Sequence, residues 1–288
     1  MSYRIETSSN TSSLFNVDAA YVIHLEGNGR LKALKKQLEM HALAPVVHIV
    51  FNKGMDDPKK QLPRQTPAHD IVDAYRYVFK ECETNGYGNV LILEDDFTFR
   101  PDLSKQDAAV VNTFLTKERK NKFVYHLGCI PAFMAPVDLQ GNYLIIGSST
   151  HASVYSQALR QQTLRYTGVI NDWDWYLTFA APRYAFTKPL IYQLYPETEN
   201  SKQWMSLFGL TYFVKIWIRI LKLDVQPEPG YSICYMVAKS MFYLGILAGI
   251  VFLYALYNLE CVLDYAGRGV LFIKQKVTAV LPSQIRSI

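Results

Sequence analysis

The stretch NVLILEDD, from Asn89 to Asp96, decides the fold. Residues 89–93 form a nearly continuous apolar run of strand length, which is typical of a parallel strand buried on both faces. The run ends abruptly in Glu94, Asp95 and Asp96, so three acidic residues lie at the carboxyl end of the strand. Open α/β sheets bind their ligands at this edge. The stretch therefore predicts both a buried strand and a functional site at its end.

Strands and helices alternate around this run. Before it, the β-prone segment Ala19–Leu25 is followed by a helical pattern over Arg30–Leu43, and Val46–Phe51 is a second strand candidate. After it, a helix is expected from about Ser104 to Lys117. Further strands are expected at Phe123–Leu127, Tyr143–Ile146 and His151–Tyr155. This alternation predicts an α/β fold with a mostly parallel sheet and flanking helices.

The clearest helix follows a polar loop over residues 52–65. Thr66 suits the N-cap and Pro67 the first helical position, and Asn85-Gly86 marks the end. The apolar residues between these signals fit one helical face. Loops as long as residues 52–65 are often functional. The sequence thus predicts a capped helix that begins beside a candidate binding loop.

The composition excludes some classes of function. The chain has 288 residues, half of them apolar, and a net charge of +5 with scattered basic residues, which argues against nucleic acid as the main partner. Its four cysteines, Cys82, Cys129, Cys234 and Cys261, match no zinc-ligand spacing and are interpreted as apolar fillers. The N-terminus lacks the pattern of a signal peptide, so we expect the first 200 residues on the cytoplasmic side.

The composition shifts near residue 200. Ser240–Leu259 holds twenty residues without a formal charge, which is long enough to cross a bilayer, although a buried core helix has the same pattern. Leu207–Leu221 mixes aromatic and basic residues, as interfacial helices do. Basic residues flank the span on both sides, so the positive-inside rule leaves its orientation open. We expect a membrane protein with a single span near its C-terminus.

The acidic triplet has two interpretations. Adjacent carboxylates either form an acidic surface turn or hold a hard divalent cation through oxygen ligands. Mg²⁺ or Mn²⁺ held this way completes its shell with substrate phosphates and stabilises a leaving diphosphate. Glu94 and Asp96, two residues apart, lie on the same side of an extended segment, while Asp95 points the other way. Glu94 and Asp96 are therefore the predicted metal ligands.

Several segments resemble glycosyltransferase family 25, the lipooligosaccharide and procollagen galactosyltransferase type. Residues 91–96 are nearly identical to that family's metal motif. The other matching segments occur in the family's order over most of residues 19–202, and they are Tyr21–Leu25 with Arg30-Leu31, Pro67–His69, Thr150–Ser156, Asn171–Asp174 and Gln193–Ser201. The sequence departs from the family pattern at Gln65–Ala68 and at the short turn Gly27–Gly29, which leaves a changed donor preference or a reduced activity open.

The resemblance implies a GT-A type, Rossmann-like fold, a nucleotide-diphosphate sugar as donor, and inversion at the anomeric carbon. One carboxylate must then take the proton of the acceptor hydroxyl. Asp172 is the first candidate for this base and Asp174 the second, although a structural or acceptor-binding acid has the same appearance. Trp173 or Trp175 stacks on a sugar in this interpretation, and packs in the core in the alternative.

Five further residues are predicted to contact the donor or its metal. Asp95 is assigned to the donor ribose, and Arg30 to the nucleotide phosphates unless it is merely solvated. His69 lies near a helix N-terminus that suits phosphate. His151 is either a metal or diphosphate contact or a satisfied core histidine, and Gln193 contacts donor or acceptor.

The leading hypothesis is a membrane-anchored, Mn²⁺- or Mg²⁺-dependent hexosyltransferase that moves galactose or glucose to a glycan, glycolipid or glycoprotein acceptor. A non-catalytic glycan-binding or scaffold protein of the same fold is the alternative, and a nucleotidyltransferase is the third. The expected division is a flexible terminus (1–18), a transferase domain (19–203), an interfacial segment (204–239), a span (240–259) and a tail (260–288).

Overall fold

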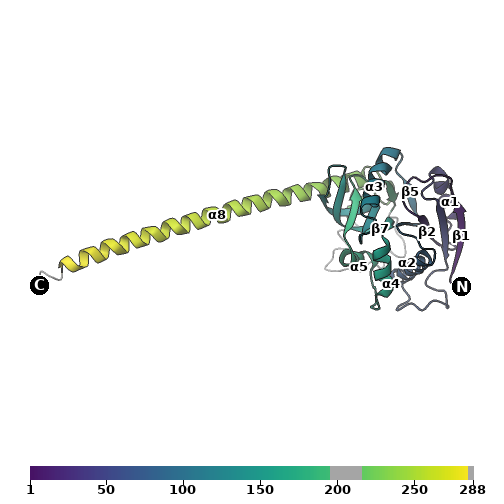
Figure 1. The fold of residues 1–288 in the computed structure, drawn as a ribbon, viewed down its shortest axis with the longest axis horizontal. Helices are drawn as coiled ribbons and strands as arrows, with labels where there is room; N and C mark the ends of the chain where they lie inside the picture. Colours follow the sequence, from purple (N-terminus) through teal and green to yellow (C-terminus); the bar gives the residue numbers. More distant parts are fainter. Residues whose placement is uncertain (195–215, 285–288) are drawn as a thin grey trace. The chain divides into compact units, whose positions relative to one another are not determined.

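The computed structural model describes residues 1–194 and 216–284 and divides into two compact units, Met1–Lys239 and Ser240–Ile288 (Figure 1). Unit 1 is built on a seven-stranded sheet of order β1-β3-β2-β4-β7-β6-β8. The strands are β1 (Tyr3–Ser9), β2 (Ala19–Leu25), β3 (Val46–Asn52), β4 (Val90–Glu94), β6 (Val124–Pro136), β7 (Asn142–Tyr155) and β8 (Arg183–Phe186).

The sheet is mixed, with one prevailing direction. Strands β3, β2 and β4 are parallel neighbours, and β6 and β8 are parallel to each other. Strand β7 is antiparallel to both β4 and β6, so five of the seven strands run the same way and β1 and β7 run against them. A mostly parallel α/β sheet with flanking helices is therefore confirmed.

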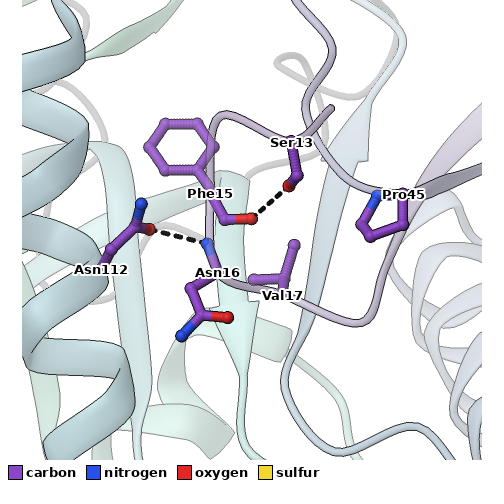
Figure 2. A pocket seen from close by; sticks show the side chains of 6 residues that line it. All are labelled: Ser13, Phe15, Asn16, Val17, Pro45 and Asn112. Carbon is purple, nitrogen blue, oxygen red and sulfur yellow. Dashed lines mark hydrogen bonds between the residues drawn. The ribbon is translucent and has the colours of Figure 1, made fainter. Parts of the chain in front are cut away.

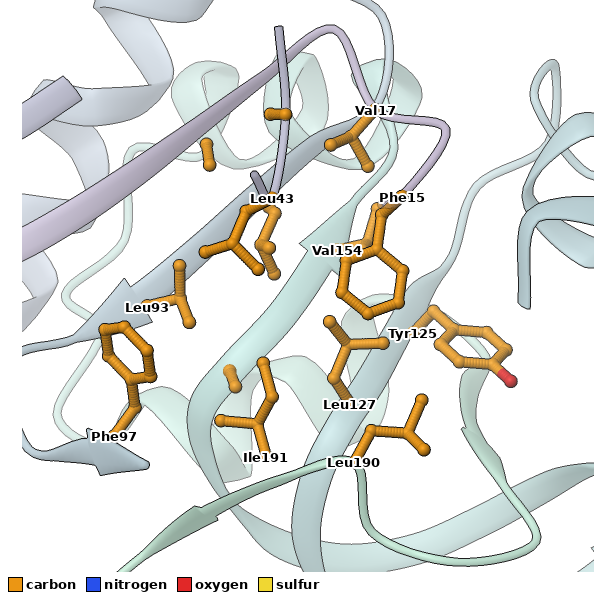
Figure 3. Packing of buried hydrophobic residues seen from close by; sticks show 14 of the residues in the cluster. Phe15, Val17, Leu43, Leu93, Phe97, Tyr125, Leu127, Val154, Leu190 and Ile191 are labelled. Atoms are coloured by element: carbon orange, nitrogen blue, oxygen red, sulfur yellow. The ribbon is translucent and has the colours of Figure 1, made fainter. Parts of the chain in front are cut away.

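Helices cover both faces of the sheet. They are α1 (Leu31–Met40), α2 (Pro67–Thr84), α3 (Lys105–Lys117), α4 (Gln157–Arg165) and α5 (Trp173–Ala180). The side chains of β4 alternate between two apolar clusters, Leu91 and Leu93 in one and Val90 and Ile92 in the other, because successive residues of a strand face opposite sides. The first cluster includes side chains of α1 and α3, and the second those of α2, α4 and α5. Figure 3 shows part of the first cluster, including Leu93 of β4 and Phe15.

Local signals explain the element boundaries. Thr66 caps α2 and its hydroxyl accepts from the His69 backbone N–H, with Pro67 opening the helix as expected. Ser104 forms a capping box with Asp107 at the start of α3. The expectation differs from the structure at the terminus, where Tyr3–Ser9 forms a strand against β3 rather than a flexible end. The two strands expected between Tyr143 and Tyr155 are one long strand, β7.

The segment after residue 215 begins within unit 1. The long helix α8 runs from Gly230 to Gln284, and its first turns bury Tyr231, Tyr235 and Ala238 in a third apolar cluster with Cys129 and other residues of the sheet. The expected boundary at residue 203 is therefore not where unit 1 ends, since these packed turns carry it to Lys239. Residues 207–215 of the expected interfacial helix lie outside the described residues.

The same helix contains the candidate membrane span. Among the described residues, Gly230–Leu259 is long and apolar enough to cross a membrane by length and composition, with a mean hydropathy of 1.9. Only 6% of its most apolar 18-residue window is buried, whereas a core helix of the same composition is mostly buried.

Candidate active site

The acidic triplet lies at the carboxyl edge of the parallel strands. Glu94 ends β4 and is in register with Ile23 of β2, which ends at Leu25. After the turn at Asp95 and Asp96, the chain enters the short strand β5 (Phe97–Phe99), which pairs with β9 (Ile191–Gln193). This pairing brings Gln193 beside the acidic turn, although the two segments are almost 100 residues apart in sequence.

Asp95 is buried and fully occupied by protein donors. Its Oδ2 lies 2.7 Å from Nδ1 of His24 and accepts from the Leu25 backbone N–H at 3.1 Å and from Asn28 Nδ2 at 2.6 Å. Its Oδ1 accepts from Arg30 Nη1 at 3.0 Å. A carboxylate with four such partners is a structural anchor for the β2 loop, and contact with a donor ribose would require one of them to be displaced.

Two glycines shape the loop that reaches Asp95. Gly27 and Gly29 have φ angles of +81° and +77°, in the left-handed region that L side chains rarely adopt. The tight turn they allow points Asn28 at Asp95 and places Arg30 at the start of α1. The short turn from Gly27 to Gly29 is therefore part of the site.

Asp96 lies between a cation and an amide. Its Oδ2 is 3.1 Å from Arg30 Nη1, and both of its oxygens are 3.0 Å from Nε2 of Gln193. Burial raises the pKa of Asp96, while Gln193 and Arg30 oppose the rise. Within the described part of the chain, Arg30 uses only Nη1 in these bonds, so Nε and Nη2 of its half-exposed guanidinium are available to a ligand.

Glu94 has fewer groups that stabilise its negative charge than Asp95 and Asp96 have. Burial, followed by the charges of Asp96 and Asp174, raises the pKa of Glu94 to about 8. The Tyr75 hydroxyl is a hydrogen-bonding neighbour that opposes this rise, and no basic side chain is among the main influences on Glu94. A carboxylate held in this way has a strong electrostatic preference for either a proton or a metal cation.

Ser149 on β7 connects Gln193 to the rest of the site. Its backbone is strained at a φ of +75°, and its Oγ lies 3.1 Å from Gln193 Oε1 and 2.7 Å from His151 Nδ1. His151 is fully buried, its Nε2 is 3.2 Å from the Ile191 carbonyl, and burial lowers its pKa to about 4. With both ring nitrogens occupied by the protein, neutral His151 orients Ser149.

Asp174 reaches the same network from α5. Its Oδ2 accepts from the Ser149 backbone N–H at 2.9 Å, and its Oδ1 is 3.3 Å from Arg183 Nη2. Burial raises the pKa of Asp174, against the effect of Arg183. Arg183 is itself held by Nε2 of His126 at 3.0 Å, so Asp174 is positioned by a buried chain of side chains.

The other candidate base has a different place. Asp172 is exposed and caps α5, where its Oδ1 accepts from the Trp175 backbone N–H at 2.7 Å. Trp173 is buried and stacks on Tyr75, so it belongs to the core. Trp175 is 62% exposed and remains the aromatic candidate for a sugar surface.

His69 presents an unusual buried atom. Its Nδ1 is 2.7 Å from the Thr66 hydroxyl, and its Nε2 has no hydrogen-bond partner among the described residues. In the tautomer that carries the ring proton on Nε2, the Thr66 hydroxyl donates to Nδ1 and the Nε2–H has no acceptor among the described residues. A buried N–H without an acceptor costs about 1–3 kcal/mol, which favours a role with a ligand oxygen.

The charges of this edge do not balance. The network joins four carboxylates, Glu94, Asp95, Asp96 and Asp174, to only two guanidinium groups, those of Arg30 and Arg183. Among the described residues, no group of three or more His, Cys, Asp or Glu side chains is arranged to hold a metal ion by itself. Carboxylate oxygens with surplus negative charge do fit a Mg²⁺ or Mn²⁺ ion that takes its remaining ligands from substrate phosphates.

Sequence reasoning found only part of this network. It named Arg30, Asp95, Asp96, Asp174 and Gln193, which the structure brings together. It did not assign roles to His24, Asn28, Ser149, Arg183 or Tyr231. His24 and Asn28 had a detectable signal, since both lie in segments singled out at the end of the first strand. Ser149, Arg183 and Tyr231 are joined to the site by tertiary contacts that no local sequence pattern indicates.

A pocket lies at the edge of the sheet opposite the acidic triplet. It has a volume of about 200 Å³ and is lined by Ser13, Phe15, Asn16, Val17, Pro45 and Asn112 (Figure 2). Val17 precedes β2, so this cavity is at the amino ends of the parallel strands. It contains none of the acidic residues.

Comparisons with known proteins give a partial likeness of fold. No protein-family model and no curated protein sequence matches the chain. The solved structure of A197 from STIV is 14% identical, with a TM-score of 0.38 over 62% of this chain and 86% of the other. A glycosyltransferase involved in glycosylation of the major capsid of PBCV-1 is 8% identical, with a TM-score of 0.30 over 51% and 63%. Apo UDP-glucose pyrophosphorylase is 10% identical, with a TM-score of 0.30 over 59% and 72%.

Proposed function

We propose that the chain is a membrane-anchored, divalent-cation-dependent glycosyltransferase that moves a hexose from a nucleotide-diphosphate sugar to a glycan, glycolipid or glycoprotein. The observation that carries the proposal is the surplus of carboxylate at the carboxyl end of β4, where Asp95 is buried and Glu94 and Asp96 are partly buried. The resemblance of residues 91–96 to the metal motif of glycosyltransferase family 25, and the GT-A type fold that it implies, give this surplus a chemical use.

The cation would be held by Glu94 and Asp96. When bound, Mn²⁺ or Mg²⁺ stabilises the negative charge of the leaving diphosphate as a Lewis acid. Gln193 fixes the Asp96 carboxylate through both oxygens, and Asp95 holds Arg30 beside it. The available N–H groups of Arg30 suit a phosphate oxygen, and the Nε2–H of His69 suits a second ligand acceptor.

Asp174 is the better placed candidate for the base. An inverting displacement needs a carboxylate that takes the acceptor proton while the leaving group departs on the other side. Asp174 is tied to Ser149 and through it to Gln193, whereas Asp172 uses its carboxylate to cap α5. A raised pKa also suits a group that must accept a proton near neutral pH.

The experiment measures release of nucleoside diphosphate from a panel of sugar nucleotides by the full chain in detergent. We expect turnover of one donor class with Mn²⁺, loss of turnover on chelation, and at least about a 100-fold loss in Asp96→Ala. Folding of the variant is checked by its circular dichroism. A well-folded wild-type chain that binds no sugar nucleotide would instead favour the non-catalytic glycan-binding or scaffold alternative, and release of pyrophosphate would favour a nucleotidyltransferase.

A further inference from the structure

The hairpin of β6 and β7 carries an exposed apolar surface in unit 1. Its tip spans Val137 to Gly141, and Leu139 at the apex is fully exposed. On β7, Leu144 and Ile146 are 40% and 59% exposed while Ile145 between them is 4% exposed. Because side chains alternate along a strand, Leu144 and Ile146 share the outer face. Exposed apolar side chains at a hairpin tip and on the outer face of its strand are suited to contact with an apolar partner.

The tip is held rigidly by hydrogen bonds of its own. Oδ1 of Asp138 accepts from the backbone N–H groups of Gln140, Gly141 and Asn142 at 2.9, 3.1 and 3.0 Å. Its Oδ2 accepts from Asn142 Nδ2 at 2.7 Å. The one acidic side chain of the tip therefore has its hydrogen-bonding capacity satisfied within the turn, and Leu139 is presented by an ordered loop.

The tip lies next to the point where the chain leaves unit 1. A Cβ at Gly141 would be 3.4 Å from the Thr187 side chain. Lys239, the last residue of unit 1, donates from Nζ to the Thr187 carbonyl at 2.8 Å and to its hydroxyl at 3.1 Å. The same Nζ lies 5.5 Å from the ring centroid of Tyr143. The hairpin tip and Lys239 are thus parts of one packed neighbourhood.

The length of the candidate span indicates which residue would lie at the boundary of the hydrocarbon layer. Of the thirty residues from Gly230 to Leu259, the ten up to Lys239 belong to unit 1 and bury Tyr231, Tyr235 and Ala238. The twenty that remain, Ser240–Leu259, make a helix of about 30 Å at 1.5 Å per residue, which equals the hydrocarbon thickness. A span that uses all twenty of these residues would begin at Ser240, next to Lys239.

We propose that the hairpin tip, Val137–Gly141, rests in the interfacial layer of the membrane that the chain spans. The partner is a lipid surface, because the exposed apolar apex belongs to the same packed neighbourhood as Lys239, the residue from which the candidate span departs. The inference rests on the membrane span of the proposed function and is independent of the transferase chemistry.

The test places a fluorescent probe on the full chain in liposomes of phosphatidylcholine and phosphatidylserine. A polarity-sensitive label is attached to Leu139→Cys, in a chain with Cys234→Ala and Cys261→Ala, since Cys82 and Cys129 are buried. The matched control is Met40→Cys, at an exposed position on α1. We expect the label at position 139 to shift its emission to shorter wavelength and to be quenched several-fold more by spin-labelled lipids than the control.

Separate outcomes distinguish the premises. If alkaline carbonate releases the chain from liposomes, unit 2 does not span the bilayer, and the membrane part of the proposed function fails together with the hairpin inference. If the chain remains inserted but both labels are quenched equally and report water, only the hairpin inference is overturned. Nucleoside diphosphate release reports on the transferase proposal independently of either result.

Discussion

Two strands of the sheet, β3 and β4, lie on either side of β2, and the charged side chains at their carboxyl ends are compensated differently. At the end of β3, the Lys60 ammonium is bound by Asp70 and Asn52, and Asn52 Nδ2 donates to the second oxygen of Asp70 at 2.8 Å. This Lys60 cluster pairs the buried cation with one buried anion, Asp70, and the half-exposed carboxylate of Asp73 lies 4.0 Å from the ammonium. At the end of β4, four carboxylates share two guanidinium groups.

The difference separates a structural ion pair from a binding site. A buried ion pair whose charges compensate each other and whose hydrogen bonds are satisfied does not require a ligand from solution. A set of carboxylates with surplus negative charge is stabilised by a proton or a metal cation. We therefore expect changes at the Lys60 cluster to affect folding and changes at the acidic edge to affect ligand binding and catalysis.

The largest effect is expected at Asp174. Asp174→Asn removes the proposed base while keeping an oxygen for the Ser149 N–H, so kcat should fall by roughly 10²–10⁴-fold with little change in donor affinity. The matched control is Asp172→Asn, which retains a capping oxygen at α5 and should keep kcat within a few-fold. Steady-state kinetics of both variants decide which of the two acids is the base. A large loss of kcat in Asp172→Asn and a small one in Asp174→Asn would assign the base to Asp172.

The next largest effect is a loss of folding stability when the Lys60 cluster is broken. Lys60→Met leaves Asp70 buried without its cation and should lower the free energy of unfolding by about 3–5 kcal/mol. The double variant Lys60→Met with Asp70→Leu should recover much of this loss. Urea-induced unfolding of unit 1, followed by its fluorescence, measures the stability of the single and the double variant. Equal stabilities of the wild type and the single variant would show that the pair is not the structural element described.

A smaller effect is expected at Gln193. Gln193→Ala removes the amide that fixes both oxygens of Asp96, and the loss of a hydrogen bond to a charged group corresponds to about 1.5–3 kcal/mol, or about 10- to 100-fold in kcat/KM. A positioning role also raises the Mn²⁺ concentration needed for half-maximal rate. Rate loss without any change in that concentration would place Gln193 at the substrate instead.

The smallest effect is a pH dependence of stability in the chelated protein. The folded chain holds a proton on Glu94 up to about pH 8, whereas the unfolded chain releases it near pH 4.5, so stability should fall as pH rises through this window. The buried histidines His126 and His151 have the opposite sign, because their pKa values are lowered, and their contribution is present equally in the wild type and in Glu94→Gln, so it cancels when the two profiles are compared.

The measurement is the thermal midpoint between pH 6.5 and 8. We expect a decline in the wild type and a flatter profile in Glu94→Gln, because the amide cannot titrate. Addition of Mn²⁺ should flatten the wild-type profile as well. Identical slopes in the wild type and Glu94→Gln would exclude Glu94 as the group with the raised pKa.

The sequence predicted the elements that depend on local signals. Strand β2 has the expected bounds, α2 begins after its Thr66 cap, and the apolar run before Glu94 is the buried strand β4. Local capping and continuous apolar strands need no information from distant residues. The order and direction of β6 to β8 could not be predicted in this way, because pairing across the sheet depends on residues far apart in the chain.

The site shows the same division. The acidic triplet and Arg30 were found from adjacent residues and from the family resemblance. The strained Ser149, the Arg183 that holds Asp174 and the Tyr231 hydroxyl that binds the Gln193 backbone were not, since each acts through a tertiary contact. Tyr231 also shows why the segment before the span is needed by the site and cannot be treated as a separate linker.

The most direct test of the account is the binding of Mn²⁺ by the full chain in the presence of a nucleoside diphosphate. Electron paramagnetic resonance of the free ion gives the stoichiometry and affinity for the wild type, for Asp96→Asn and for the double variant of the Lys60 cluster. We predict one Mn²⁺ per chain in the wild type and the double variant, and an affinity at least about tenfold weaker in Asp96→Asn. A wild-type chain that takes up no Mn²⁺, or an Asp96→Asn variant that binds as tightly, would contradict the assignment of the acidic edge as a cation site.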